Sequence, residues 1–173
     1  MSNWFMLNLI GNDQTGIVAK VTDALYQGGC HLGETSMMRL GGNFTMMMMV
    51  NVKGSADALA AMLKPVAKAM NLHVHIDAIE GRLHQHIEPN VRVTVYGADR
   101  AGIVAQVTGV LTKSGMNILD LESDVGGSEQ QPIYIMYIEG RIDDGVETVR
   151  SALEPVSKQG IDVDVEEIDT LIG

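Results

Sequence analysis

Alternating hydrophobic positions mark the start of each half of the chain. Val91, Val93 and Val95 alternate with Arg92, Thr94 and Tyr96, and the segment 4–10 is similarly rich in apolar residues. Alternation with a period of two is typical of a strand that turns one face toward a core. We therefore expect one strand over 91–96 and another over 4–10.

The hydrophobic period changes directly after each of these strands. Apolar residues now recur every three or four positions, which is the spacing of one helical face. Glycines at 28, 29 and 115 predict where the two helices end, because glycine readily adopts the conformation that closes a helix. The residues that share the predicted helical face are Ile17, Val21, Ala24 and Leu25 in the first half and Ile103, Val107, Val110 and Leu111 in the second.

Each half then continues through the same order of patterns. A weak strand pattern, a glycine-containing turn and an apolar strand pattern come first, followed by a second helical stripe and a final alternating strand. Each second helix contains a Leu-x-Pro-Val string, whose proline is expected to kink or cap it. The turn at 126–132 is expected to be a longer loop than the turn at 41–43. The predicted segments are 33–40, 44–52, 59–70 and 72–77 in the first half and 118–125, 133–138, 146–156 and 161–166 in the second.

The two halves are copies of one pattern. The string Gly-Asn-Asp-Gln-Thr-Gly-Ile-Val-Ala at 11–19 returns as Gly-Ala-Asp-Arg-Ala-Gly-Ile-Val-Ala at 97–105. Strand, helix, strand, strand, helix, strand is the ferredoxin-like βαββαβ unit. We therefore expect an α+β fold of two modules, each a four-stranded antiparallel sheet with two helices on one face. Module 1 should span 1–80 and module 2 should span 91–173, with a linker over 81–90.

Two of the predicted strands are apolar on both sides. The runs 44–50, with four consecutive methionines, and 133–138 leave no polar face for solvent. With both helices on one side of each sheet, the other side stays exposed unless another body covers it. We expect that the modules pair within the chain and that the protein forms a homodimer.

Composition narrows the class of protein. The 173 residues carry a formal net charge of −10, which weighs against direct binding of nucleic acid. The single cysteine, Cys30, excludes an internal disulfide framework, and the N-terminus resembles no export signal, so we expect a cytoplasmic protein. The longest apolar run, 44–50, is too short to cross a bilayer, and no membrane association is expected.

The repeated Gly-x-Asp-x-x-Gly string falls between a strand and a helix. Backbone amides at a helix start, together with the helix dipole, suit a small anion such as a carboxylate. Asp13 and Asp99 are equally well placed to be simple helix caps, and the spacing alone leaves both interpretations open. The glycine spacing differs from a dinucleotide-binding turn, and no Gly-Lys-Ser/Thr follows as in a phosphate loop.

The string 97–108, followed by Leu111, Gly115 and Asn117-Ile118, resembles an ACT domain, a small regulatory module that binds amino acids. The string 11–32 resembles a second one, and together the two cover nearly the whole chain. The resemblance implies βαββαβ modules that associate, with amino acids bound at module interfaces near the first turn. It places the candidate ligand-binding residues at Asn12, Asp13, Gln14, Thr15, Gly16, Ile17, His31 and Leu32 in copy one and at Ala98, Asp99, Arg100, Ala101, Gly102, Ile103, Asn117 and Ile118 in copy two.

The resemblance further implies a non-enzymatic regulatory protein. Tandem ACT proteins of this type include regulators of the glycine cleavage system, so the expected role is in transcription regulation of amino-acid metabolism, glycine metabolism in particular. The expected partners are a small amino acid and a DNA-binding transcription factor, and no cofactor is expected. The alternative is a structural or protein-interaction module that binds no ligand.

The two copies differ at positions that matter for recognition. Copy one has Gln14 where copy two has Arg100, and only the arginine can pair a carboxylate through two hydrogen bonds. Copy one has His31 where copy two has Asn117, whose amide can bond both ends of an amino acid. We therefore expect two unequal sites.

Five histidines raise the question of a metal site or a catalytic centre. His73 and His75 would share one strand face, with His84 and His86 nearby. Copy two has aspartates where copy one has His73 and His75, so a solvated face is the better interpretation. Cys30 and His31 are adjacent in sequence, which rarely presents both side chains to one point. We expect no metal and no catalytic residues.

Overall fold

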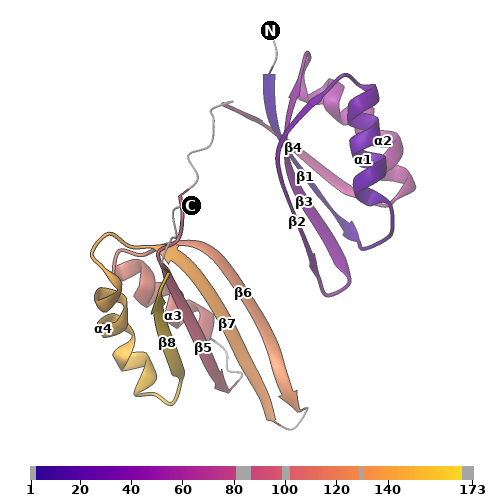
Figure 1. The fold of residues 1–173 in the computed structure, drawn as a ribbon. Coiled ribbons are helices and arrows are strands. Elements are labelled where there is room, and N and C mark those ends of the chain that lie inside the picture. The colour runs from indigo at the N-terminus through magenta and orange to yellow at the C-terminus, as the bar shows by residue number, and fades with distance from the viewer. Residues whose placement is uncertain (1–2, 81–86, 99–101, 129–130, 169–173) are drawn as a thin grey trace. The chain divides into compact units, whose positions relative to one another are not determined.

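The computed structural model describes residues 3–80, 87–98, 102–128 and 131–168 (Figure 1). The chain divides into two compact units, Met1–His84 and Gln85–Gly173. Of the predicted linker, residues 81–86 lie outside the described residues. Asn90, at its end, is bound to the second unit through its backbone and through its side chain, whose Nδ2 donates to the Ile142 carbonyl at 2.7 Å.

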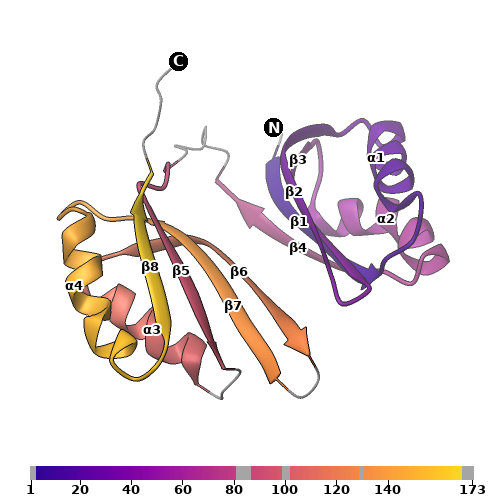
Figure 2. The same cartoon turned by 60° about the horizontal axis from the view of Figure 1, so that its bottom comes forward.

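The first unit contains one antiparallel sheet and two helices. Its strands lie in the order β2-β3-β1-β4, so the first and third strands are central. Both helices cover the same side of the sheet (Figures 1 and 2). The elements in chain order are β1 (Asn3–Asn12), α1 (Ile17–Gln27), β2 (His31–Leu40), β3 (Asn43–Val52), α2 (Ala56–Ala69) and β4 (His73–Ile79).

The second unit repeats this topology. Its strands lie in the order β6-β7-β5-β8, again with two helices on one side of the sheet (Figures 1 and 2). The predicted α+β fold of two βαββαβ modules is thereby confirmed. The elements in chain order are β5 (Val91–Ala98), α3 (Ile103–Lys113), β6 (Asn117–Ser128), β7 (Gln131–Arg141), α4 (Val146–Ser157) and β8 (Asp162–Glu167).

Each module has its own hydrophobic core between the sheet and the helices. Alternate residues of the central strands enter it, as the period of two predicts. In module 1 the completely buried side chains include Leu7 of β1, Leu25 of α1 and Leu59 of α2. In module 2 the corresponding positions are Val93 of β5 and Leu111 of α3.

The first helix of each module, α1 or α3, ends where the sequence predicts. The second helix of each module, α2 or α4, is not capped by its proline. Gly29 and Gly115, just beyond α1 and α3, adopt left-handed conformations with φ of 70° and 86°. Pro65 and Pro155 lie inside α2 and α4, which both continue past them. Each proline removes one hydrogen bond from its helix, the one that its missing N–H would donate to the carbonyl four residues earlier.

The expected long loop in module 2 is wrong. Residue pairing between β6 and β7 continues through Gly127 with Pro132 and Ser128 with Gln131, so the additional residues lengthen the hairpin. Pro132 fits there because it lies beyond Ile133, whose pair with Ala98 is the last one between β7 and β5. No hydrogen bond to β5 therefore requires the N–H that proline lacks.

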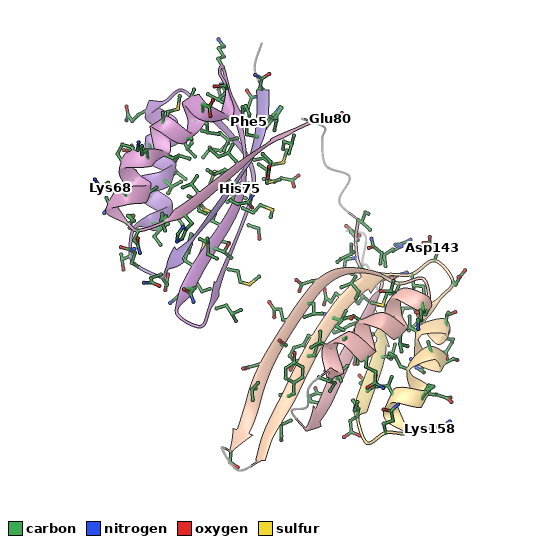
Figure 3. The ribbon with its side chains drawn as sticks, turned by 180° about the vertical axis from the view of Figure 1, so that it is seen from behind. Phe5, Lys68, His75, Glu80, Asp143 and Lys158 are labelled. Atoms are coloured by element: carbon green, nitrogen blue, oxygen red, sulfur yellow. The ribbon has the colours of Figure 1, made fainter. Side chains whose placement is uncertain are left out.

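The side of each sheet opposite the helices carries large exposed side chains, and we call it the open face of the module. Ile10 and Met47 lie on the open face of module 1, and Tyr96 and Tyr137 lie on that of module 2. Figure 3 shows side chains standing on both sides of the sheets. In the described part of the chain, no helix is long and apolar enough to cross a membrane.

Candidate ligand-binding site

The turn between β1 and α1 is closed by a glycine in a left-handed conformation. Gly16 is the N-cap residue of α1 with φ of 91°, and no side chain caps the helix. Asp13 is three residues earlier and does not reach the first helical turn. The interpretation of Asp13 as a helix cap is therefore wrong, because the chain needs a residue with positive φ at the N-cap and glycine supplies it.

Asp13 instead joins the turn to the β2–β3 hairpin. Its amide donates to the Gly42 carbonyl at 2.9 Å, and its Oδ2 lies 2.5 Å from Nη2 of Arg39. The Asp13 side chain is 25% exposed and that of Arg39 is 69% exposed. The carboxylate is thus held at the protein surface by a largely exposed arginine side chain.

Gln14 joins the same turn to the end of α2. Its Nε2 donates to the carbonyl oxygen of Met70 at 2.8 Å, so the side chain ends one helix with a hydrogen bond. Thr15 is exposed, and Asn12 is an exposed end residue of β1 that pairs with Asn43. Ile17 is buried and serves the core. The predicted candidates of this turn therefore lie together, but two of them already bond the chain itself.

The corresponding turn of module 2 has the same backbone and different neighbours. Gly102 is the N-cap of α3 with φ of 89°, again without a side-chain cap, and Ile103 is buried. Strand pairing places Val125 beside Tyr134 and Gly97, as Arg39 is placed beside Phe44 and Gly11. Module 2 therefore has an apolar side chain at the position of Arg39. Of the other candidates, Ala98 ends β5, while Asp99, Arg100 and Ala101 lie outside the described residues.

Both helix starts are suited to a carboxylate oxygen. Since no side chain of the described residues caps either α1 or α3, the first amide groups of each helix are placed to bind a ligand. The positive end of the helix dipole adds roughly 0.3–1 kcal/mol for an anion at this place. This geometry is present in both modules.

His31 and Asn117 lie at the opposite end of their sheets from these turns. His31 begins β2 and pairs with Asn51 of β3, and Asn51 in turn pairs with Trp4 of β1. Trp4 is eight residues before Asn12, which lies at the other end of β1. A strand rises about 3.3 Å per residue, which separates His31 from Asn12 by roughly 26 Å. Asn117 begins β6 and pairs with Arg141, and the neighbouring residue Gly140 pairs with Val91 at the start of β5. Ala98 lies at the other end of β5.

The structure therefore does not bring all candidates together within one module. The same holds for the residues that follow these two, Leu32 and Ile118, of which Leu32 is exposed and Ile118 half-buried. A single module offers either a helix start or the His31 or Asn117 position to a small ligand.

Arg39 and Met70 are the parts of the site that sequence reasoning missed. A signal for Arg39 was present, since a turn at Gly41 and Gly42 aligns it with Phe44, and Phe44 pairs with Gly11 at the candidate turn. Met70 contributes a backbone carbonyl, for which a sequence offers no signal.

A metal centre finds no support in the geometry. Within 3–80, 87–98, 102–128 and 131–168, no three His, Cys, Asp or Glu side chains gather as metal ligands. His73 and His75 are exposed on the open face of module 1, where Nε2 of His75 lies 3.0 Å from Oδ2 of Asp77. Figure 3 labels His75 on β4. His84 and His86 lie outside the described residues.

Cys30 packs against the core of module 1 in the short connection between α1 and β2. It is half-buried, as predicted for a small residue aligned with Met116 of copy two. Burial raises the pKa of the Cys30 thiol. The protonated thiol is the less reactive form, so this environment opposes a role as nucleophile.

Comparison with known proteins agrees with the duplicated architecture. The family model described as "ACT domain" matches residues 3–77 and again 91–166. The glycine cleavage system transcriptional repressor of Escherichia coli (strain K12) is 23% identical over 138 residues, which are 79% of this chain and 73% of that protein. The UPF0237 protein YjhC of Lactococcus lactis is 36% identical over 83 residues, 46% of this chain and 95% of that one.

A solved structure shares the fold along the whole length. The crystal structure of an unknown protein from Galdieria sulphuraria superimposes with a TM-score of 0.77 at 24% identity, covering 98% of this chain and all of the other. Both βαββαβ modules therefore have a counterpart of known structure. With the family model matched twice, in the same order and over most of both modules, the chain belongs to the ACT-domain family as a tandem ACT regulatory protein.

Proposed function

We propose that this tandem ACT protein is a non-enzymatic regulator that binds a small amino acid at sites shared between modules and acts on a partner protein. The observation that carries the proposal is the separation within each module. Asn12, in the turn before α1, and His31 lie at opposite ends of the module 1 sheet, roughly 26 Å apart by the strand rise. Ala98 and Asn117 likewise lie at opposite ends of the module 2 sheet.

A free amino acid is far too small to span that separation. A ligand that uses both regions must take the turn from one module and the strand start from another, whether in the same chain or in a second copy. Such a shared site gives the ligand different affinities for associated and separated modules. A ligand can shift an equilibrium only through a difference of this kind.

The chemistry of the two regions suits the two ends of an amino acid. The uncapped helix start attracts the carboxylate, while aspartate and the amide oxygen of Asn117 accept hydrogen bonds from the ammonium group. We propose that the site at the start of α3 binds more tightly than that of α1. In module 1, Asp13 is already paired with Arg39, and Gln14 is bonded to Met70.

We further propose that the partner is a DNA-binding transcription factor and that the regulated process is amino-acid metabolism, with glycine as the first ligand to test. The relative from Escherichia coli is named as a transcriptional repressor of the glycine cleavage system. The net charge of −10 repels the phosphate backbone, so repression by this chain would require another protein to contact DNA.

Thermal unfolding of the full chain with each of the twenty amino acids tests the proposal. A ligand at about 100 times its Kd stabilises the folded state by roughly 2.7 kcal/mol, which raises the unfolding temperature measurably. We expect one or a few small amino acids to do so, and a matched series of the corresponding amines, which lack the carboxylate, to fail. Absence of any shift across the twenty would contradict amino-acid binding.

The internal bonds of module 1 also favour a second candidate function. Since Asp13 and Gln14 are both satisfied by the chain itself, the turn of module 1 needs no ligand to be stable. A purely structural interaction module would show this arrangement in both copies. Binding of an amino acid that depends on Asp99 would exclude it.

A further inference from the structure

The open face of module 2 has an aromatic centre. Tyr96 of β5 and Tyr137 of β7 are diagonal neighbours, since Tyr96 pairs with Ile135 and Tyr137 pairs with Thr94. Both tyrosines are about two-fifths exposed, at 40% and 42%, yet Thr94, which pairs with Tyr137 and precedes Tyr96 on the same face, is only 8% exposed. Burial together with Tyr137 raises the pKa of Tyr96.

Carboxylates flank this centre on both sides. On β8, Asp162 and Asp164 stand beside Tyr96 and Thr94. On β6, Glu122 and Asp124 stand beside Tyr137 and Ile135, and Asp120 stands beside Glu139. Residues paired directly across a sheet project from the same face, so these side chains border one surface.

The arginine side chains of this face leave several of its carboxylates without a cation. Arg92 donates to Oε1 of Glu139 through Nε at 2.9 Å and Nη2 at 2.7 Å, and its Nη1 lies 3.9 Å from Glu166. Arg141, at the end of β7, lies 3.5 Å from Asp143. The carboxylates left on the face without a cation in the described residues are Asp120, Glu122, Asp124, Asp162 and Asp164.

We propose that the open face of module 2 is a docking surface for a segment of a partner protein that carries at least two Lys or Arg side chains around an apolar centre. The inference rests on the proposed action through a partner protein and names the surface and the chemistry that such a partner needs. Tyrosine rings and carboxylates both attract cationic side chains, and complementary charge sets which partner is accepted.

The width of the surface argues for a protein segment over a single small cation. The acidic strands β6 and β8 are the outer strands of the sheet, with β7 and β5 between them. Three spacings of about 4.8 Å put the two rows of carboxylates about 14 Å apart. One small cation reaches only one row, whereas two basic side chains on one segment reach both.

Charge argues against the two other occupants considered, which are the same face of a second copy and the open face of module 1. The same face of a second copy would place carboxylate against carboxylate. The open face of module 1 has Met6, Met47 and His75 where module 2 has Arg92, Tyr137 and Asp164. It mixes apolar side chains with polar ones such as Asn8, His73 and Asp77. Among the described residues of β1, β3 and β4 it carries no Lys or Arg, so it offers no permanent cation to the acidic rows.

A peptide titration of the full chain followed by amide NMR tests the proposal. The probe is acetyl-Arg-Val-Thr-Val-Arg-amide, whose arginines lie about 14 Å apart when extended. The control peptide acetyl-Arg-Arg-Val-Thr-Val-amide has the same composition with adjacent arginines. We expect shift changes confined to β5 to β8 and weaker binding of the control peptide. Absence of shifts, shifts centred on module 1, or equal binding of both peptides would overturn the proposal.

Matched variants separate this surface from general attraction to an acidic protein. Changing Asp162 and Asp164 together to asparagine should weaken binding by about threefold to tenfold. The control, Asp23→Asn with Glu34→Gln in module 1, removes the same charge and should change nothing. Equal weakening in both variants would count against the docking surface.

Substitutions of Tyr137 test the aromatic centre without changing the charge of the surface. Tyr137→Ser should weaken binding by about threefold, while Tyr137→Phe retains the ring and should bind within about twofold of the original chain. Tyr26→Ser, which removes the exposed tyrosine of α1, should have no effect. If Tyr137→Ser does not fold, Tyr137→Leu takes its place. Unchanged binding without the ring would overturn the role of the centre, and amino-acid binding remains testable whatever the peptide does.

Discussion

The Asp13 carboxylate lies 2.5 Å from the Arg39 guanidinium, although the two residues are on different elements at one end of the module 1 sheet. The pair connects the turn before α1 with the end of β2. Together with the hydrogen bond from the Asp13 amide to Gly42, it holds the hairpin against the turn. The geometry of a candidate ligand site is thus set in part by a residue of β2, which is separated from β1 by β3.

A double-mutant cycle measures this connection. Because Arg39 is largely exposed, Asp13→Asn and Arg39→Gln should each lower the free energy of unfolding by at most about 1 kcal/mol. The coupling between them should be about 0.2–1 kcal/mol. Trp4, the only tryptophan, lies in β1 and reports the urea unfolding of module 1 by its fluorescence. A coupling of zero would mean that the pair contributes nothing measurable.

Glycines in module 2 should respond in opposite directions to alanine. Gly102→Ala introduces a side chain at φ of 89°, which should destabilise the module by roughly 1–2 kcal/mol. Gly109 lies inside α3 with no neighbouring atom within 4 Å of an added Cβ, so Gly109→Ala should stabilise the module by up to about 1 kcal/mol. Calorimetric melting of the two variants checks this. Equal effects of the same sign would contradict the strain assigned to Gly102.

The fold could be predicted from the sequence because the hydrophobic positions follow the periods of strands and helices and because the whole pattern occurs twice. Alternation at Val91, Val93 and Val95 and the helical stripe through Ile17, Val21 and Leu25 depend only on neighbours in the chain. The repeat then supplied the order of elements twice. The prediction failed at the hairpin around 126–132, where glycines and a proline suggest a loop but antiparallel pairing extends the strands.

The candidate site was predictable only in part because its contacts come from register and from backbone atoms. The Gly-x-Asp-x-x-Gly string located the turn, but a helix-cap role for Asp13 follows naturally from local spacing. Only the pairing of β2 with β3 and of β3 with β1 brings Arg39 to it. The separation of His31 from the turn likewise depends on strand direction, which the string itself does not contain.

Cys30 should react slowly with thiol reagents in the folded protein. Burial raises the pKa of its thiol, so at a given pH less thiolate is present than in the unfolded chain. Reaction with a disulfide reagent should therefore be slower than in urea, and its rate should rise at higher pH. The sign of the stability effect follows: as pH rises, the unfolded chain loses this proton first, so stability decreases. A folded rate equal to the rate in urea would contradict the assignment.

The two turns should contribute unequally to ligand binding. Asp13 is engaged by Arg39, whereas the position of Arg39 is held by Val125 in module 2. Asp99 lies outside the described residues, and its expected role rests on its place in the repeat, with Arg100 beside it and Asn117 in the same copy. Asp99→Ala should therefore weaken binding of a stabilising amino acid more than Asp13→Ala does.

Isothermal titration calorimetry of both variants, with the amino acid that most raises the unfolding temperature, makes the comparison direct. Val125→Arg is the matched test, since it transplants the Arg39 position into module 2. If a paired aspartate is a poorer ligand group, that variant should weaken binding in the same direction as Asp99→Ala but less. Equal losses for Asp13→Ala and Asp99→Ala would show that the differences between the copies, at Gln14 and Arg100 and at His31 and Asn117, do not set ligand selectivity.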